Sequence, residues 1–508
     1  MKTETKVYDY NKDKVRATLL NAFRKHGGEA AAADLVSFTG LPKHQVETEL
    51  PALADEYRGR LKVTESGTIV YSFPQGYASR YRGLGPSLKR FFGGFFKVAG
   101  KVAAFLFKIW IMVMLVGYFV LFLALVVFAI VASIALSVAG SKGSSSRSRG
   151  SSGMFGLTMG LVRAFMRIWF YSELFKSPQQ RQREMELRLQ RGAKAGAAGG
   201  EKRPMHRRIF SFIFGEIDPN AGHDQVERRL FVALAQQGKG MVLLEEFMAL
   251  TGLSADQADL AISRYLYEFE GSPEVTANGT IYYHFPKLLE RARAETGAVG
   301  LSAMQQPRPF SANSRKANAG YALINGVNLL FGGFFLYAWQ NLDIVSSYGK
   351  GTQVAEFFYS IVYLLFSYLT PDPRALIGIA LGVVPIVFSL LFWLVPLVRA
   401  GRVKAENRAI SQQNLRRTLY ARVLENPTAF NPHQIGNLPA TVGKADSKAL
   451  VKTTEALAAY EQAESLTGDS WNFAELQRKL QDIAAIRRAV KADDYKLGDT
   501  VFDTNEPG

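Results

Sequence analysis

Few residues of this chain have both the type and the spacing that catalysis or metal binding requires. The sequence contains no cysteine, which excludes disulfides, thiolate nucleophiles, and zinc or iron–sulfur sites ligated by cysteine. It contains no phosphate-binding Walker loop, HExxH helix or EF-hand pattern. The six histidines are scattered and show no ligand spacing: His26, His44, His206, His223, His284 and His433. We therefore predict no catalytic residue, no metal site and no cofactor, and expect that the protein is not an enzyme.

The remaining candidate functional residues are basic side chains, which are suited to contact a phosphate backbone or an acidic protein partner. The 508 residues include 61 Lys and Arg against 44 Asp and Glu, a formal charge of +17. Many of these basic residues flank apolar blocks, as they do at the cytoplasmic ends of membrane segments. The candidate nucleic-acid or partner contacts are Lys43, His44, Arg58, Arg60 and Lys62. An ordinary solvated domain edge is the alternative explanation for the last three.

The elements that would position these side chains belong to an internal repeat. Residues 39–74 align without a gap with residues 251–286, and fourteen of the 36 positions are identical. Such self-similarity predicts a duplication. Each copy has the pattern of an amphipathic helix (15–25; 225–236), a short helix (31–38; 243–250), a Thr-Gly-Leu turn and a third helix. We assign residues 1–76 and 221–290 to the two copies.

Each copy ends in two short strands, predicted at 61–65 and 68–73 and at 274–277 and 280–285. The dipeptides Ser66-Gly67 and Asn278-Gly279 are typical of tight hairpin turns, where positive φ is required. Three helices followed by a β-hairpin are the winged-helix arrangement. The fold and shared ancestry explain the repeated glycines and aromatic residues without any ligand.

Winged helices bind either DNA or proteins, and the charge of the third helix distinguishes the two uses. A recognition helix needs Arg, Lys, Asn or Gln at base edges and basic support for phosphates. Residues 43–58 contain two basic and four acidic side chains, and residues 254–270 contain one and four. Acidic side chains repel phosphate. We therefore favour protein interaction, with nucleic-acid binding as the less favoured alternative.

Residues 102–139 form the longest apolar block, with Lys108 as its single charge. As one α-helix the block would be longer than ~50 Å, against a hydrocarbon core of about 30 Å. It either projects beyond the bilayer or folds back near Gly117. Basic residues on both flanks favour the second arrangement, with both ends in the cytoplasm. We predict a membrane segment at 88–140 that forms a helical hairpin.

A Ser/Gly/Arg linker at 142–153 separates this block from an amphipathic stretch. Arg163 and Arg167 lie four residues apart among Phe, Leu, Met and Trp. Two arginines in the middle of a span are costly, so we expect this stretch to lie in the membrane interface. Residues 154–208 are predicted to form this amphipathic helix and a charged linker.

A second membrane region is predicted at 319–399. Its segments 321–339 and 376–398 are long enough to span a bilayer, whereas segment 357–369 is short. Asn325 and Asn328 are the main polar groups in the spans, which is weak support for a transport path. The pairs Gly93-Gly94 and Gly332-Gly333 lie in similar FGGFF strings and are candidates for close helix packing, or are flexible apolar sequence.

Residues 209–220, IFSFIFGEIDPN, and 67–74, GTIVYSFP, resemble a poorly characterised family of multi-pass membrane proteins. Its members occur in bacteria, including cyanobacteria, and in plant plastids, and some plant members carry the label "iron–sulfur cluster biosynthesis family". The resemblance runs from the first repeat to the basic stretch after residue 398. It implies no catalytic residue. This chain offers no cysteine to ligate a cluster, although an assembly role without a bound cluster stays open.

Taken together, these patterns predict a mainly α membrane protein with two winged-helix (α+β) soluble domains, transmembrane helices and a helical cytoplasmic tail at 400–508. We expect a membrane-anchored scaffold or assembly factor in a bacterial inner membrane, with its soluble domains in the cytoplasm. Its expected partners are the lipid bilayer and a cytoplasmic protein of unknown identity. A membrane-tethered transcriptional regulator is the alternative, and a transporter or channel component is a weaker one. The sequence leaves the oligomeric state open.

Overall fold

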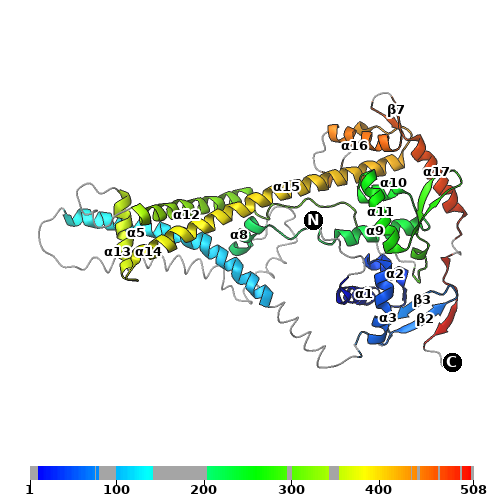
Figure 1. The fold of residues 1–508 in the computed structure, drawn as a ribbon, viewed down its shortest axis with the longest axis horizontal. Helices are drawn as coiled ribbons and strands as arrows, with labels where there is room; N and C mark the ends of the chain where they lie inside the picture. The colour runs from blue at the N-terminus through cyan, green and yellow to red at the C-terminus, as the bar shows by residue number, and fades with distance from the viewer. Residues whose placement is uncertain are drawn as a thin grey trace, which may run out of the picture. The chain divides into compact units, whose positions relative to one another are not determined.

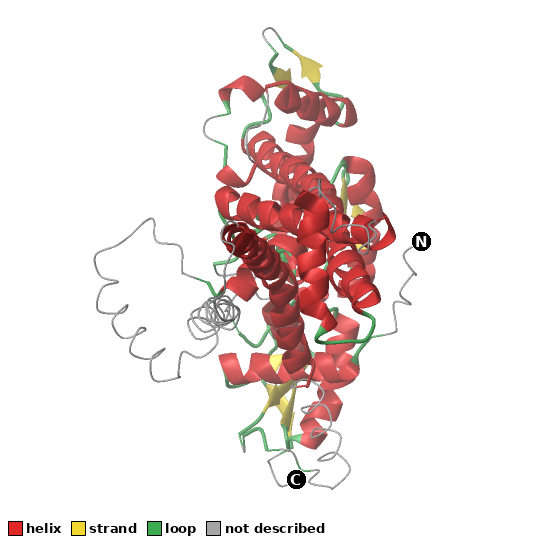
Figure 2. Cartoon of the chain, turned by 90° about the vertical axis from the view of Figure 1, so that its left-hand side faces the viewer, coloured by secondary structure: helices red, strands yellow, loops and turns green. Residues whose placement is uncertain are grey.

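A computed structural model describes residues 10–74, 76–78, 80, 99–140, 203–293, 300–341, 354–435, 438–442, 447–466, 469–491 and 495–504. The chain is mainly helical, with small antiparallel sheets (Figure 2). It divides into two compact units. Unit 1 comprises Met1–Arg90, Asp218–Arg308 and Ala405–Gly508, and unit 2 comprises Phe91–Ile217 and Pro309–Lys404. The amphipathic stretch predicted from residue 154, and also Gly93 and Gly94, lie outside the described residues.

The first repeat in unit 1 contains the three helices expected from the sequence. They are α1 (Lys12–His26), α2 (Ala32–Thr39) and α3 (Lys43–Glu56). The antiparallel strands β2 (Arg60–Thr64) and β3 (Ile69–Ser72) follow, with Gly67 at φ 78° in the turn between them. A two-residue strand that the sequence did not predict, β1 (Ala30–Ala31), precedes α2 and pairs with β3.

The second repeat has the same order of elements (Figure 1). Helices α9 (His223–Gln237), α10 (Leu244–Thr251) and α11 (Ala255–Phe269) agree closely with the predicted ranges. Strand β5 (Ser272–Val275) begins two residues earlier than expected, and β6 (Ile281–His284) pairs with it. Strand β4 (Met241–Val242) occupies the place of β1, and a 3₁₀ turn, η2 (Pro286–Leu288), follows β6.

Aligned residues of the two repeats make the same local contacts. Gly40 and Gly252 end the second helices with φ of 67° and 68°, a left-handed conformation that favours glycine. The hydroxyl of Thr39 donates to the Leu35 carbonyl, and Thr251 makes the equivalent bond one helical turn back. These side-chain bonds explain why the Thr-Gly pair recurs in both segments.

The tail contributes mixed secondary structure to unit 1 rather than helices alone. After α15 (Val384–Glu425) come η4 (Pro432–Gln434), η5 (Ala440–Val442), α16 (Ser447–Tyr460), β7 (Glu464–Ser465), β8 (Trp471–Asn472), α17 (Ala474–Ala489) and β9 (Thr500–Asp503). Strand β9 pairs antiparallel with β2, which extends the first sheet to the order β1-β3-β2-β9 (Figure 1). The sequence analysis missed this strand because its partner is more than 430 residues away.

One hydrophobic core joins the two repeats and the tail. It includes Phe23 and Leu50 from the first repeat, Phe231 and Phe285 from the second, and Phe473 from the tail. Burial of such large side chains is the main stabilising contribution to a fold. The three chain segments of unit 1 therefore form a single body.

The first apolar block of unit 2 is a continuous helix, so the predicted hairpin is wrong. Helical backbone runs from residue 99 to 140, through the π-helical turn η1 (Val113–Gly117) into α5 (Tyr118–Gly140). A helix satisfies its backbone hydrogen bonds internally, whereas a reversal in hydrocarbon would leave several without partners. Gly117 ends a widened helical turn instead of forming a loop.

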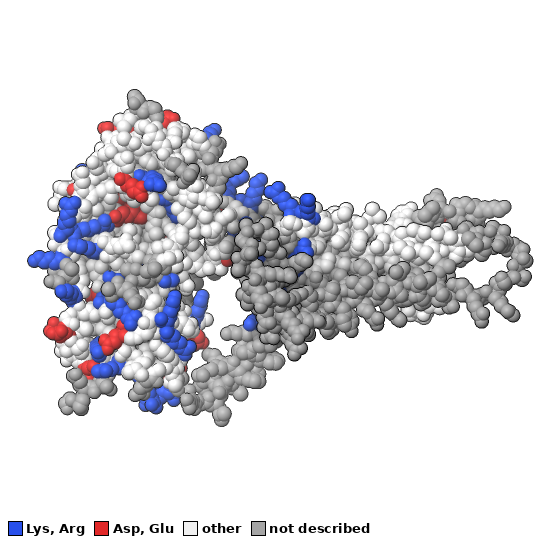
Figure 3. Space-filling model, turned by 180° about the vertical axis from the view of Figure 1, so that it is seen from behind, with Lys and Arg blue, Asp and Glu red and all other residues white. Residues whose placement is uncertain are grey.

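The remaining elements of unit 2 are α8 (Met205–Phe214), α12 (Arg315–Asn341), α13 (Val354–Ser367), α14 (Pro373–Ile377), the π-helical turn η3 (Gly378–Val383) and the start of α15. Three helices among the described residues are long and apolar enough to cross a membrane, Ala99–Ala135, Arg315–Asn341 and Pro373–Glu425. Helix α13 is apolar but short, as its sequence suggested. Figure 3 shows interspersed acidic and basic side chains on unit 1.

Small and polar residues pack α12 against its neighbours. A side chain on Gly332 would meet Ile386, 3.0 Å from its Cβ position, whereas Gly333 has open space beside it. Of these two predicted packing glycines, Gly332 is therefore the one at a close helix approach. The amides of the buried Asn325 and Asn328 donate to the carbonyls of Ser389 and Leu115. Leu115 lies in η1, where the π-helical turn alters the normal backbone pairing. These contacts hold three helices together.

Candidate functional site

The predicted contact cluster begins at the start of α3, where Lys43 is buried. Its ammonium lies 2.7 Å from Glu47 and 2.7 Å from Glu270 of the second repeat. Both carboxylates hold the pKa of Lys43 above its ordinary value, although burial opposes them. The charge of Lys43 is therefore used to join the two repeats.

His44 lies beside Lys43 and also faces the second repeat. Its ring is 5.4 Å from the Tyr267 ring and 6.4 Å from the Tyr10 ring. Neither ring nitrogen has a hydrogen-bond partner among the described residues. Burial lowers the pKa of His44, although Glu268, Glu270 and Glu47 oppose this. A neutral, packed imidazole is a poor phosphate contact.

The wing residues of the first repeat are mostly paired as well. Arg60 forms a two-point hydrogen-bonded ion pair with Asp503 of β9, in which its Nε lies 2.7 Å from Oδ1. The Lys62 ammonium lies 2.5 Å from Glu29. Arg58 is exposed and has a positive φ of 53°. Of the five predicted contacts, Arg58 is the one whose side chain faces solvent.

The third helices of the two repeats pack against each other, with Lys43 of α3 bound to Glu270 at the end of α11. Glu49 of α3 is buried and lies 2.5 Å from Arg16. Glu268 of α11 is also buried and lies 2.7 Å from Arg228, which follows Arg16 at the same spacing of 212 residues as in the repeat. Several of the acidic residues that the sequence marked as unfavourable for DNA therefore form ion pairs inside unit 1, whereas Asp256 and Asp259 of α11 are exposed.

Both hairpin turns are held by the tail. In the first repeat, the amides of Glu65 and Ser66 donate to the carbonyls of Asp499 and Leu497. In the second repeat, the Asp482 carboxylate of α17 accepts from Asn278 at 2.8 Å and from Thr280 at 2.7 Å. The tips of the two hairpins are consequently not free to enter a nucleic-acid groove.

A buried carboxylate connects the repeats at a second place. Asp34 accepts hydrogen bonds from the Ala31, Ala292 and Arg293 amides. The Arg293 guanidinium donates hydrogen bonds to the carbonyls of His26, Gly27 and Glu29. Burial raises the pKa of Asp34, while these amide donors oppose the shift. The segment after the second repeat thus caps the first.

The tail binds the second repeat through buried charges. Arg417 of α15 donates to Glu227 at 3.1 Å, to Asn414 at 3.0 Å and to the Leu250 carbonyl at 3.0 Å. On α17, Lys479 lies 2.7 Å from Glu245 and 3.0 Å from Glu461. These residues were missed by the sequence analysis, because a single Arg or Lys in a helix gives no signal of burial.

Unit 1 carries exposed apolar side chains on the second repeat and on strand β9, where Val501 and Phe502 are 69% and 58% exposed. Leu260 of α11 is 79% exposed, and the cross-strand pair Val275 and Ile281 is 63% and 58% exposed. Strand β5 is an edge of its sheet, whereas its counterpart β2 is covered by β9. Apolar side chains of this kind are candidates for contact with a protein partner.

A comparison of the whole sequence with known proteins gives one relative. The chain resembles a plastid protein. Over 424 residues it is 23% identical to an uncharacterised chloroplastic protein of Arabidopsis thaliana, a match that covers 81% of this chain and 73% of the relative. No family model and no solved structure matches the chain.

Proposed function

We propose that this protein is a membrane-anchored scaffold or assembly factor whose two repeats are winged-helix domains that bind protein. The order of three helices and a β-hairpin in each repeat supports the assignment of the domains. The apolar helices of unit 2 would anchor the chain, in a bacterial inner membrane with unit 1 in the cytoplasm.

The observation that carries the proposal is the mutual packing of α3 and α11. A DNA-binding winged helix inserts its third helix into the major groove and supports it with basic phosphate contacts. Here Lys43 and His44 at the start of α3 contact α11, and Arg60 and Lys62 are ion-paired. DNA binding would require these contacts to break.

The first experiment measures DNA binding by the full chain in nanodiscs of neutral lipid, across a salt series. We expect no salt-dependent binding to a random-sequence duplex, even at low salt. Micromolar or tighter affinity that falls steeply with salt would indicate several phosphate contacts. That result would replace the scaffold with the membrane-tethered regulator.

A second experiment tests protein binding directly. A photo-crosslinking amino acid replaces Leu260 or Ile281 in cells, and Glu425, an exposed residue near the end of α15, serves as the control position. The proposal predicts discrete adducts with one soluble protein from Leu260 and Ile281 and none from Glu425. Equal, diffuse labelling from all three positions would contradict a specific partner surface.

A further inference from the structure

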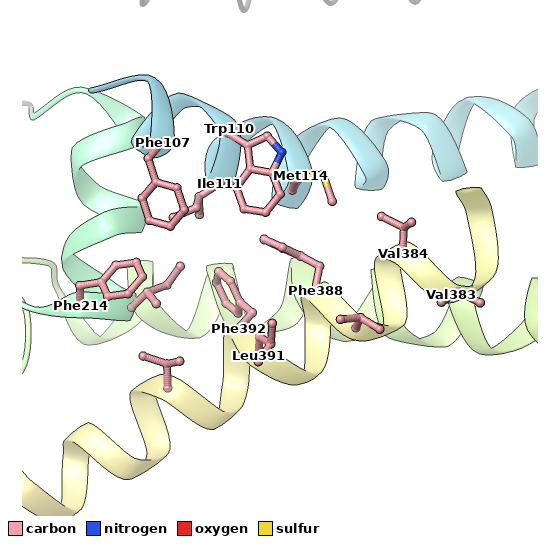
Figure 4. Close-up of a pocket in the computed structure, with 13 residues that line it drawn as sticks. Phe107, Trp110, Ile111, Met114, Phe214, Val383, Val384, Phe388, Leu391 and Phe392 are labelled. Carbon is pink, nitrogen blue, oxygen red and sulfur yellow. The ribbon is translucent and has the colours of Figure 1, made fainter. Parts of the chain in front are cut away.

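Unit 2 contains an apolar groove of about 410 Å³ between three helices (Figure 4). Phe107, Trp110 and Met114 of the Ala99–Ala135 helix line one side. Phe388 and Leu391 of α15 line the other, and α8 closes one end. We infer that this groove binds one acyl chain of an anionic membrane phospholipid, with the headgroup beside Lys108.

The dimensions of the groove fit a single chain from one bilayer leaflet. Its lining on η3 and α15 runs from Val383 to Val395, which corresponds to about 18 Å of helix. One leaflet of the hydrocarbon core is about 15 Å thick.

The chemistry of the walls excludes polar occupants. The thirteen lining side chains are aliphatic, aromatic or Met. A ligand with hydrogen-bonding groups would lose its water without gaining partners there. Trp110 and Leu391 are about half exposed, so the groove is open at its side to the surroundings of the helices. A hydrocarbon chain can enter through this opening from the bilayer.

Arg399 fixes the closed end of the groove. Its guanidinium donates to the carbonyls of Phe212 at 2.7 Å, Ile213 at 3.0 Å and Phe310 at 2.5 Å, and lies over the Phe310 ring. Two of these carbonyls belong to the last turn of α8, where helices lack internal donors. Helix α8 is therefore held against α15, one wall of the groove.

Positive charge lies at the same end. The Lys108 ammonium is 4.4 Å from the centre of the Phe210 ring, and the Phe210 ring contacts the tilted ring of Phe214, which lines the groove. Among the described residues Lys108 makes no ion pair, and Arg207 of α8 is exposed and makes none. Lysines extend along apolar surface to reach the headgroup level. The charges of Lys108 and Arg207 complement the phosphate of an anionic lipid, whose headgroup carries no positive charge of its own.

The test uses the full chain in phosphatidylcholine nanodiscs that contain a trace of photoreactive lipid. The diazirine is on the acyl chain, and the headgroup is either phosphatidylglycerol or phosphatidylcholine. We expect the phosphatidylglycerol probe to label peptides containing residues 107–114 or 383–395 more strongly than the phosphatidylcholine probe. Lys108→Gln should reduce this ratio of labelling by about fivefold, because one basic residue near anionic lipid contributes about 1 kcal/mol. Arg402→Gln, an exposed site farther along α15, should not change it.

A second test blocks the groove with a large side chain and compares the labelling by lipid. Leu391→Trp places a large ring in the groove and should abolish the labelling, whereas Leu394→Trp, equally exposed on α15 but outside the lining, should leave it intact. Equal labelling of both variants, or equal labelling by both lipids, would show ordinary boundary lipid and overturn the proposal. A photo-crosslinker at Trp110 that captures a protein segment instead of lipid would also overturn it.

Discussion

Arg417 is fully buried, and its contribution to stability depends on the groups with which it pairs. Its guanidinium donates to the partly buried Glu227 carboxylate and to the Leu250 carbonyl at the end of α10. Burial raises the pKa of Glu227, while the attraction of Arg417 opposes this shift. Removing the arginine therefore leaves an unpaired charge in the interior.

We predict that Arg417→Ala destabilises unit 1 by about 3–5 kcal/mol, the usual cost of breaking a buried ion pair. Hydrogen exchange of the α9 and α10 amides should become faster by at least about a hundredfold. Arg422→Ala is the matched control, because Arg422 and its partner Glu425 are both exposed. Similar exchange rates in the two variants would show that the Arg417 contacts contribute little.

Glu461 makes the docking of the tail sensitive to pH. Burial, with the neighbouring Glu245 carboxylate, raises the pKa of Glu461 to about 7, although Lys479 opposes this. A glutamate in an unfolded chain titrates at about 4.3. The folded protein thus holds this proton more tightly than the unfolded chain. Stability from this group is full below about pH 4 and falls as the pH rises to about 7.

Glu461→Gln should remove this contribution, which is at most about 4 kcal/mol. The midpoint of thermal unfolding is measured at pH 5 and pH 8 for both proteins in the same detergent. We expect the wild type to lose more stability than the variant between these values. Glu464→Gln, at an exposed position on β7, should behave as the wild type. An unchanged pH dependence in Glu461→Gln would refute the assignment.

At the scale of elements, the contact between α12 and η3 depends on glycine. The indole of Trp339 occupies the space that a side chain on Gly378 would need, and the Leu336 backbone lies 3.1 Å from the Cβ position of Gly382. These glycines form a Gly-x-x-x-Gly pattern, which permits close helix approach in membranes. The sequence analysis had considered the adjacent pairs Gly93-Gly94 and Gly332-Gly333 instead.

Gly378→Ala should therefore destabilise unit 2 by about 1–3 kcal/mol, the usual cost of overpacking. The readout is the temperature at which the protein in detergent loses its monodisperse peak in size-exclusion chromatography. Gly401→Ala, in α15 with open space around it, should be neutral or slightly stabilising. If both variants aggregate at the wild-type temperature, Trp339 moves aside without a loss of stability, and close packing at Gly378 does not stabilise unit 2.

At the scale of the whole molecule, the C-terminal segment is part of the fold of the N-terminal repeat. Strand β9 pairs with β2, and the carbonyls of Leu497 and Asp499 accept the Ser66 and Glu65 amides. Truncation after Lys496 should accelerate hydrogen exchange of these two amides roughly tenfold, because each loses one hydrogen bond.

The second repeat provides an internal control for this truncation. The Thr276 amide donates to the Thr280 carbonyl within its own hairpin, so its exchange should not change. A uniform acceleration in both hairpins would mean that the truncation unfolds unit 1 as a whole. No change at Glu65 and Ser66 would mean that β9 does not occupy the β2 edge in solution.

The sequence by itself determined the elements of the two repeats and the apolar segments, because these depend on local signals. Hydrophobic periodicity indicated the helices, the Thr-Gly and Ser-Gly or Asn-Gly pairs indicated turns with positive φ, and block length indicated the candidate spans. It also identified the acidic character of both third helices. Its expectation that the chain has no catalytic site is a prediction that the present observations do not test.

Tertiary structure alone decided which of these elements meet. Arg60 and Asp503 are 443 residues apart. The neighbouring sequence does not distinguish an arginine in an intramolecular ion pair from one that binds a ligand. The same holds for Lys43 and Glu270, and for the choice between a continuous helix and a hairpin at Gly117. Periodicity reports which face of an element is apolar, but the partner that covers this face is set by packing of the whole chain.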